Sequence, residues 1–144
     1  MPESLSEFAD DFAAFIQAFG LLRTDATPCG QPISISTAHA LCELAASAYN
    51  HQCLADRLGL SKSATSRLVD QLELKGWAKR DEDPSGSDRR VRVIRLTVEG
   101  EAAATRVLHA RAQRFGQLLE AIPAEDQDQV LKALKILRKA ARDS

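Results

Sequence analysis

The stretch 54–68, LADRLGLSKSATSRL, constrains the fold more than any other part of this 144-residue chain. Two short helices that meet at a sharp turn need a small residue where their backbones approach, and Ala55 supplies one. The turn itself needs a residue that accepts a positive φ, which Gly59 does without steric cost. The pattern therefore predicts a helix-turn-helix, with helices over about 51–58 and 61–75. The alternative is an ordinary αα-hairpin.

The second of these helices presents small and basic side chains on its outer face. A serine at its start can cap it by accepting a hydrogen bond from a free N–H of the first turn. Such a helix can enter the major groove of DNA with its N-terminal residues at base edges, where Arg67 can pair with guanine through two hydrogen bonds. The alternative for each side chain is a plain solvated surface. The residues expected to contact DNA from this helix are Ser61, Lys62, Ser63, Ser66 and Arg67.

The hydrophobic period changes after Gly76, where the sequence predicts two strands over about 77–81 and 90–97. A two-stranded ribbon beside a recognition helix is typical of a winged helix. We therefore expect a mainly α chain with a winged helix-turn-helix over about 36–97 and a wing of two or three strands.

The connection between the two strands, 83–88, is polar and rich in turn residues, and Arg89 and Arg90 follow it directly. We expect Asp88 to pair with one of these arginines and to hold the tip of the wing. Guanidinium groups favour narrow, electronegative minor grooves, so these three residues are further candidates for DNA contact. The alternative is a surface hairpin with incidental charge.

Amphipathic helices are expected at both ends of the chain, over about 4–22, 98–121 and 124–142, with Pro123 at the first position of the last one. Their apolar residues recur at steps of three and four and so form narrow stripes. Such a stripe packs against the core of its own chain or against a second subunit. Three of them on one short chain favour a homodimer. The expected interface residues are Phe8, Phe12, Phe15, Phe19, Phe115, Leu119, Leu134 and Leu137.

Proline and glycine residues predict a loop over 23–35, between the first helix and the winged part. A helix over about 37–48 should follow, with Ser36 or Thr37 as its N-cap.

Charge is unevenly distributed, although the net charge is only −1. Residues 1–60 hold two basic and seven acidic side chains, whereas residues 61–96 hold nine basic and six acidic ones. A local surplus of this kind can form a basic patch for phosphate. The alternative is a solvated surface of mixed charge.

Several classes of protein are excluded by what the sequence lacks. No apolar run approaches 18 residues, and the N-terminus is acidic rather than basic, so we expect neither a membrane span nor a secretory signal. Three cysteines without C-x-x-C spacing favour a reduced cytoplasmic setting. No H-E-x-x-H, P-loop or nucleophile elbow is present, so we expect neither an enzyme nor a cofactor. A winged module that contacts only proteins is the alternative to a DNA-binding regulator.

The chain resembles the MarR family of bacterial regulators through four segments, 54–72, 75–77, 83–90 and 96–100. The resemblance covers nearly the whole chain. It implies a triangular homodimer, joined by its terminal helices, that binds pseudo-palindromic promoter DNA at the bacterial nucleoid. It also implies a role that is often repression, with release by a small phenolic ligand or an oxidant.

Position by position, Asp88 and Arg90 fall on the paired acidic and basic wing residues of that family, and 61–67 falls on the first half of its recognition helix. Thr65 departs from the family pattern, which usually has an aliphatic residue here. Threonine adds a hydroxyl group that needs a hydrogen-bond partner, so we expect slightly looser packing beneath the helix.

The sequence indicates less about the signal that such a regulator senses. The peroxide-sensing branch of that family carries its reactive cysteine on the first helix, which has none here, and Cys29 in the following loop is the remaining redox candidate. Cys42 and Cys53 are expected to be buried and inert. A metal site built from His39, Cys42, His51 and Cys53 is an alternative, and a small organic effector is the default.

Overall fold

The computed structural model describes residues 3–82 and 92–144, in two compact units, Met1–Ala110 and Arg111–Ser144, that we treat separately. Helix α5 spans the boundary between them, and α6 lies in the second unit. None of the described helices is long and apolar enough to cross a membrane. The elements in chain order are α1 (Glu3–Phe19), α2 (Ile35–Ala46), β1 (Tyr49–Asn50), α3 (His51–Leu58), α4 (Lys62–Leu74), β2 (Ala78–Glu82), β3 (Arg92–Leu96), α5 (Val98–Glu120) and α6 (Ala124–Asp143).

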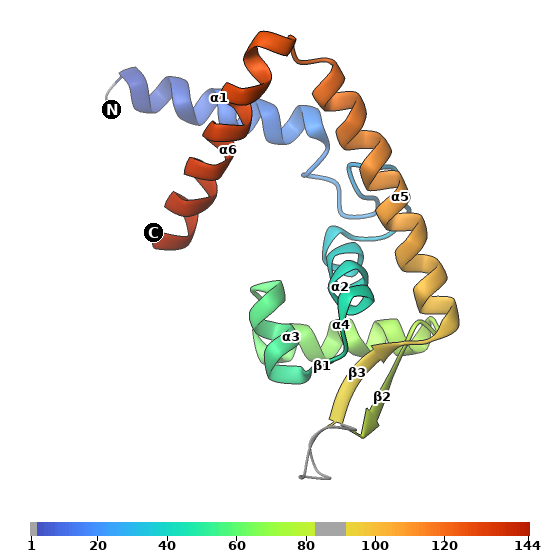
Figure 1. The fold of residues 1–144 in the computed structure, drawn as a ribbon. Coiled ribbons are helices and arrows are strands. Elements are labelled where there is room, and N and C mark those ends of the chain that lie inside the picture. Colours follow the sequence, from blue (N-terminus) through green and yellow to red (C-terminus); the bar gives the residue numbers. More distant parts are fainter. Residues whose placement is uncertain (1–2, 83–91) are drawn as a thin grey trace. The chain divides into compact units, whose positions relative to one another are not determined.

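The sheet is small and antiparallel, with the strand order β1-β3-β2 (Figure 1). β2 and β3 form the predicted ribbon, in which Ala78 pairs with Leu96. Tyr49 of β1 pairs with Ile94 on the other edge of β3. The wing therefore has three strands, the larger of the two numbers expected. No strand was expected at β1, because two residues are too few to carry an alternating pattern.

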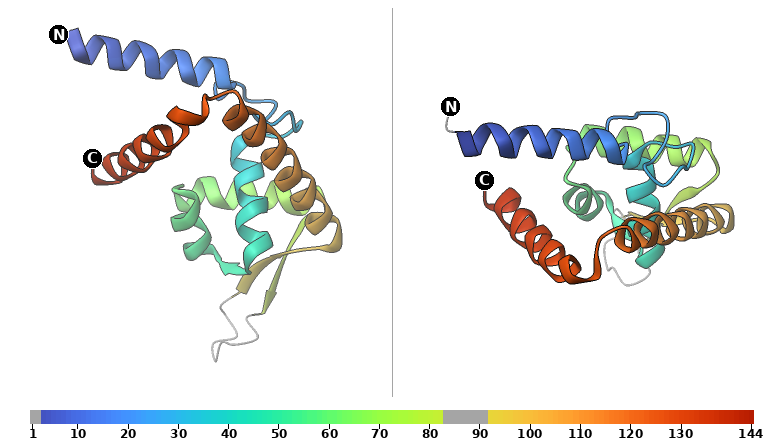
Figure 2. Two further views of the ribbon diagram at one scale, coloured as in Figure 1. Left: turned by 45° about the horizontal axis from the view of Figure 1, so that its top comes forward. Right: turned by 90° about the horizontal axis from the view of Figure 1, so that it is seen from above.

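The core of the first unit lies where α2, α3 and α4 meet the sheet. Figure 2 shows α2 standing beside both α3 and α4. The largest side chains with almost no exposed surface come from these elements: Leu41, Leu54, Leu72, Ile94, Val69 and Thr65. Removing one such leucine side chain typically costs about 2–5 kcal/mol. This core fixes the crossing of α3 and α4, and so it fixes which face of α4 is left outside.

The bounds of α3 and α4 agree with the prediction, but the start of α2 does not. The N-cap residue is Ser34, whose Oγ accepts a hydrogen bond from the N–H of Thr37 over 3.1 Å. Ser36 and Thr37, the predicted caps, both lie inside the first turn. Ser34 is the N-cap because its backbone is extended, as a cap requires. Its hydroxyl also lies three residues before an N–H that has no partner within the helix.

The junction before α6 also differs by one residue from the prediction. Pro123 is the N-cap of α6 and not its first helical residue. The side-chain amide of Gln127 reaches back to the carbonyls of Leu119 and Ile122, over 3.1 and 3.2 Å. The Leu119 carbonyl also accepts from the N–H of Ile122 over 3.1 Å, so these bonds together hold the turn between α5 and α6.

Candidate nucleic-acid interface

The turn between α3 and α4 has the geometry that its sequence predicts. Gly59 ends α3 at φ 65° and ψ 32°, the left-handed region in which a Cβ atom is costly. The N–H of Leu60 then donates to the carbonyl of Ala55 over 3.1 Å, and Ala55 itself is buried. Together with the sheet, this turn confirms the winged helix-turn-helix fold.

Side-chain caps define where both helices of the motif begin. Asn50 Oδ1 accepts from the N–H of Cys53 over 2.8 Å at the start of α3. Ser61 Oγ accepts from the N–H of Ala64 over 3.1 Å at the start of α4. Ser61 was predicted both as a cap and as a DNA contact. Its oxygen also lies 3.3 Å from the Ser63 hydroxyl oxygen, so the two predicted contact residues share a hydrogen bond at the start of the helix.

Helix α4 has one buried and one solvent-facing side. The buried side consists of Thr65, Leu68, Val69 and Leu72. Of the predicted contact residues, Ser61, Lys62, Ser63 and Arg67 are exposed, and Ser66 is half-buried. The free N–H groups and positive dipole end of α4 lie next to Lys62 and Ser63, which makes this end of the helix suited to a phosphate.

An arginine of the wing, for which no role was predicted, connects β2 to α4. The Arg80 guanidinium bonds Glu73 through Nη1 and lies 3.2 Å from Asp70 Oδ1 through Nη2. Asp70 and Glu73 are three residues apart and therefore share a face of the helix. In the sequence, the shared helix face of the two acids was the signal that a cation could bind there. The spacing along the chain does not reveal that this cation lies on β2.

The base of the wing is joined to α5 through Thr97. Its hydroxyl donates to the carbonyl of Gly76 over 2.5 Å and accepts from the N–H of Gly100 over 3.1 Å. A Cβ atom on Gly100 would lie 1.8 Å from the carbonyl oxygen of Trp77, so the backbones approach closely here. The threonine and glycine of the LTVEG segment at 96–100 therefore have a structural role in holding α5 against the wing.

The described part of the ribbon carries a small cluster of charges. Asp81 Oδ2 lies 3.5 Å from Lys79 Nζ on its own strand and 3.3 Å from Arg95 Nε on the neighbouring one. The predicted tip residues Asp88, Arg89 and Arg90 lie outside the described residues, and so does the predicted pairing of Asp88.

A second ion pair braces α2 against α3. Arg57 Nε donates to Glu43 Oε2 over 2.7 Å, and the Arg57 guanidinium lies 4.9 Å from the centre of the Tyr49 ring. His39 Nε2 lies 3.5 Å from the other carboxylate oxygen. The hydrogen bond from Arg57 is the main cause that lowers the pKa of Glu43. The same hydrogen bond to Glu43 is the main cause that raises the pKa of Arg57. The brace fixes the first helix of the motif to the core helix behind it.

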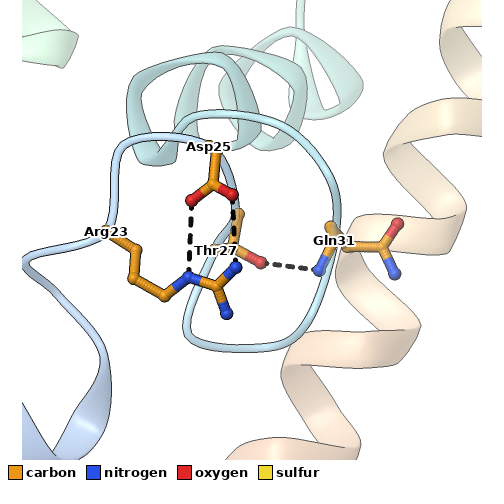
Figure 3. A network of polar contacts seen from close by, with 4 residues as sticks. All are labelled: Arg23, Asp25, Thr27 and Gln31. Carbon is orange, nitrogen blue, oxygen red and sulfur yellow. Dashed lines mark hydrogen bonds and ion pairs between the residues drawn. The ribbon is translucent and has the colours of Figure 1, made fainter.

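The loop between α1 and α2 is held by its own polar contacts (Figure 3). The Thr27 hydroxyl accepts from the N–H of Gln31 over 3.1 Å, and the N–H of Thr27 donates to the carbonyl of Gln31 over 2.9 Å. Arg23 bonds Asp25 over 3.3 and 3.4 Å and thereby lowers the pKa of that carboxyl. Cys29, the redox candidate, is half-buried within this loop.

The other two cysteines differ from each other. Cys42 is half-buried, but Cys53 is exposed in the first turn of α3, so the prediction of a buried thiol is wrong for Cys53. Among residues 3–82 and 92–144, no three His, Cys, Asp or Glu side chains lie close enough to hold a metal ion. The four residues considered for a metal, His39, Cys42, His51 and Cys53, therefore do not assemble.

The predicted interface residues on the terminal helices are mostly open to solvent. Phe8 is 54% exposed and Leu134 52% exposed, and Leu137 is half-buried. Phe19 is an exception, since it is only 9% exposed and belongs to the interior of its own chain. Its place in a subunit interface stays a prediction. The remaining exposed members are Phe12, Phe15, Phe115 and Leu119.

Comparison with known sequences points to one family. The MarR family pattern matches residues 53–90, which include most of α3 and all of α4 and β2. The transcriptional repressor MprA of Escherichia coli (strain K12) is 34% identical over 73 residues. That alignment covers 51% of this chain and 40% of the repressor, so the chain spans less than half the length of this curated relative.

Solved structures share the fold over nearly the whole chain. The PcaV transcriptional regulator from Streptomyces coelicolor is similar with a TM-score of 0.71 and 22% identity, over 94% of this chain and 98% of that one. FabT from Streptococcus pneumoniae, solved in complex with DNA, is similar with a TM-score of 0.75 and 17% identity. The match covers 98% of this chain and 97% of FabT. At these identities the likeness concerns the fold alone.

Proposed function

We propose that this chain is a transcriptional regulator of the MarR type and not an enzyme, namely a homodimeric, sequence-specific DNA-binding protein that acts as a repressor in the cytoplasm. The observation that carries the proposal is the two-sided character of α4. One side is locked into the core, whereas Lys62, Ser63 and Arg67 stand in solvent at its N-terminal half. A helix held from behind in this way can be inserted into a major groove without rearrangement.

Within this proposal the side chains have separate tasks. Arg67 reads a base edge, with guanine as its preferred partner. Lys62 and the serines Ser61, Ser63 and Ser66 bind phosphates and fix the register of the helix on the duplex. Arg89 and Arg90, steadied by Asp88, reach the adjacent minor groove and add affinity more than base choice.

The exposed apolar residues of the terminal helices support the homodimer. Aromatic and leucine side chains at steps of three and four, open to solvent, are typical of a subunit interface. Two copies related by a two-fold axis present two recognition helices to a pseudo-palindromic operator. A small organic ligand or an oxidant releases the DNA, and Cys29 is the candidate thiol for the second case.

The test is selection of bound genomic fragments, followed by affinity measurements on a selected site across a range of salt. Specific binding should weaken steeply with salt, since phosphate contacts release counterions. Arg67→Ala should cost about 1–3 kcal/mol on the selected site and relax the preference at one base pair per half-site. Arg106→Ala, which removes an exposed cation from α5, is the matched control.

Three outcomes would overturn the proposal or revise one of its parts. A flat salt response with no preferred site would favour the alternative, a winged module that contacts only proteins. An equal loss on all sequences after Arg67→Ala would make that residue a phosphate contact. For the homodimer, Phe12→Ser with Phe15→Ser should give monomers by light scattering, and a variant that stays dimeric would remove this stripe from the interface.

A further inference from the structure

One acidic side chain of α4 lies beside the arginine that is expected to read a base. Arg67 and Asp70 are three residues apart, which places them about 60° apart around the helix axis and about 4.5 Å apart along it. Both side chains are exposed. Residues with this spacing are neighbours on the surface of a helix, and opposite charges there attract each other. The Asp70 carboxylate is therefore within reach of the guanidinium group that Arg67 would offer to DNA.

In the structure, however, Asp70 has a different partner. The Arg80 guanidinium lies 3.2 Å from Asp70 Oδ1 through Nη2, and it bonds Glu73 through Nη1. Arg67 forms no ion pair within residues 3–82 and 92–144. The acid one turn beyond Arg67 is thus bound by a cation from β2.

The sheet fixes the position from which Arg80 reaches α4. Its Cα pairs with that of Ile94, which is only 2% exposed. Ala78, two residues earlier on the same face of β2, is buried as well. The face of the strand that carries Arg80 is therefore turned towards the core. From there its fork of N–H donors binds two carboxylates at once, which a lysine would not do with the same geometry.

This contact contributes less to the packing of α4 than the core does. Thr65, Leu68, Val69 and Leu72 hold the helix from behind. The Asp70 side chain is 61% exposed, and an ion pair that is open to solvent adds little to stability, because water and salt screen it. The contact therefore matters more for the distribution of charge on the outer face of α4 than for the attachment of the helix.

We propose that Arg80 is a positioning residue for DNA recognition: by binding the Asp70 carboxylate, it leaves the Arg67 guanidinium free to contact a base. This role rests on the proposed function, in which Arg67 reads a base edge, and it adds a residue of the wing that acts on base choice without touching DNA. Without Arg80, the Asp70 carboxylate pairs with Arg67, and that pair must break before Arg67 enters the major groove. Specificity then falls together with affinity, because the same guanidinium group provides both.

Removal of the Arg80 side chain is the first test, made on an operator obtained by selection of genomic fragments. Arg80→Ala should weaken binding by up to about fivefold per half-site at low salt, the upper end of what an exposed ion pair contributes. It should also relax the preference at the base pair that Arg67→Ala affects. Fluorescence anisotropy measures the affinity of the full chain for the operator and for operators changed at each base pair in turn.

The second test removes the competing carboxylate as well. Arg80→Ala with Asp70→Asn leaves no acid beside Arg67, so affinity and base preference should return to within about twofold of the unaltered chain. Arg80→Ala with Glu73→Gln is the matched control, because it removes one acidic charge from the same helix and the same ion-pair network. Glu73 lies about 120° around the axis and about 9 Å along it from Arg67, too far to pair with it. This control should therefore not restore the base preference.

Two further measurements distinguish positioning from other roles of Arg80. Chemical denaturation gives the unfolding free energy of each variant, and a residue that only stabilised the fold would change this quantity without changing base preference. The salt dependence of binding counts phosphate contacts, because each contact releases counterions. Its slope should stay the same in Arg80→Ala, whereas loss of a direct phosphate contact would lower the slope by about one per half-site.

The outcomes separate the role of Arg80 from the proposed function beneath it. An Arg80→Ala variant with full affinity and base preference would overturn the role while leaving specific DNA binding in place. So would a lower salt slope, or a failure of Asp70→Asn to restore the preference. An unaltered chain with no preferred site would overturn the proposed function itself, and the role of Arg80 with it.

Discussion

In the winged part of the chain, from α2 to β3, leucines such as Leu41, Leu54 and Leu72 are shielded from solvent, whereas α6 has no buried residue. Charges follow the same division. Glu43 pairs with Arg57 in the winged part, whereas the basic side chains Lys132, Lys135 and Arg138 of α6 are exposed. The difference teaches that one copy suffices to pack the winged part, and that the terminal helices present surfaces suited to a second molecule.

Two glycines on α5 provide the sharpest contrast between these regions. Gly100 lies against the backbone of Trp77, and an added Cβ would meet its carbonyl oxygen at 1.8 Å. Gly100→Ala should therefore destabilise the protein by about 4 kcal/mol or more, the range that severe overpacking of a rigid site produces. Chemical denaturation followed by circular dichroism measures the loss.

Gly116→Ala is the matched control on the same helix. No atom of the described chain lies within 4 Å of a Cβ added there. Alanine in an open helical position should stabilise the protein by up to about 1 kcal/mol. A loss at this position that grows with protein concentration would show that a second subunit approaches Gly116, and would refine the comparison.

A pair of leucines tests the same contrast through burial. Leu72→Ala removes a fully buried side chain and should cost about 3 kcal/mol, whatever the protein concentration. Leu134→Ala removes a side chain that is 52% exposed in the single chain. The substitution should change the unfolding free energy of the monomer little. Its main effect should be a larger dimer dissociation constant. Equal losses of unfolding free energy in dilute solution would break the comparison.

The winged part was largely predictable because its signals are local. Gly59, Ala55 and Ser61 each do what their residue type requires at a tight turn, and the bounds of α3 and α4 followed from them. The exposed face of α4 followed as well, since a helix with one apolar side leaves the other in solvent.

The features that the sequence did not reveal depend on partners distant along the chain. Phe19 continues the stripe of α1 but turns out to be buried, and no spacing rule distinguishes it from Phe15. The contacts of Arg80 with α4 depend on the angle between strand and helix. The exposed thiol of Cys53 depends on which side of a short helix the core covers.

Thr65 is a site in the winged part where a buried polar group lacks a hydrogen-bond partner among the described residues. Its side chain is fully buried, and its hydroxyl oxygen has no hydrogen-bond partner among the described residues. Thr65→Val replaces that hydroxyl with a methyl group of similar size and should stabilise the protein by about 1 kcal/mol. Thermal and chemical denaturation measure the gain, and Thr105→Val, at an exposed position of α5, is the control. A destabilised Thr65→Val variant would indicate that the hydroxyl bonds a buried water.

The ion pair of Glu43 with Arg57 should give the smallest effect, because Arg57 is half exposed and solvent screens the pair. Arg57 lowers the pKa of Glu43 from its ordinary value of 4.5. The stabilisation is therefore present above pH 4.5 and is lost as the pH falls through the lowered pKa of the folded state. Glu43→Gln should reduce stability slightly at neutral pH and abolish this share of the acid dependence, so that the two proteins converge at low pH. Denaturation curves between about pH 2 and 7 measure the difference. A constant gap across that range would mean that the brace between α2 and α3 acts through packing and hydrogen bonding, and the charge contrast between the two regions would then rest on the terminal helices alone.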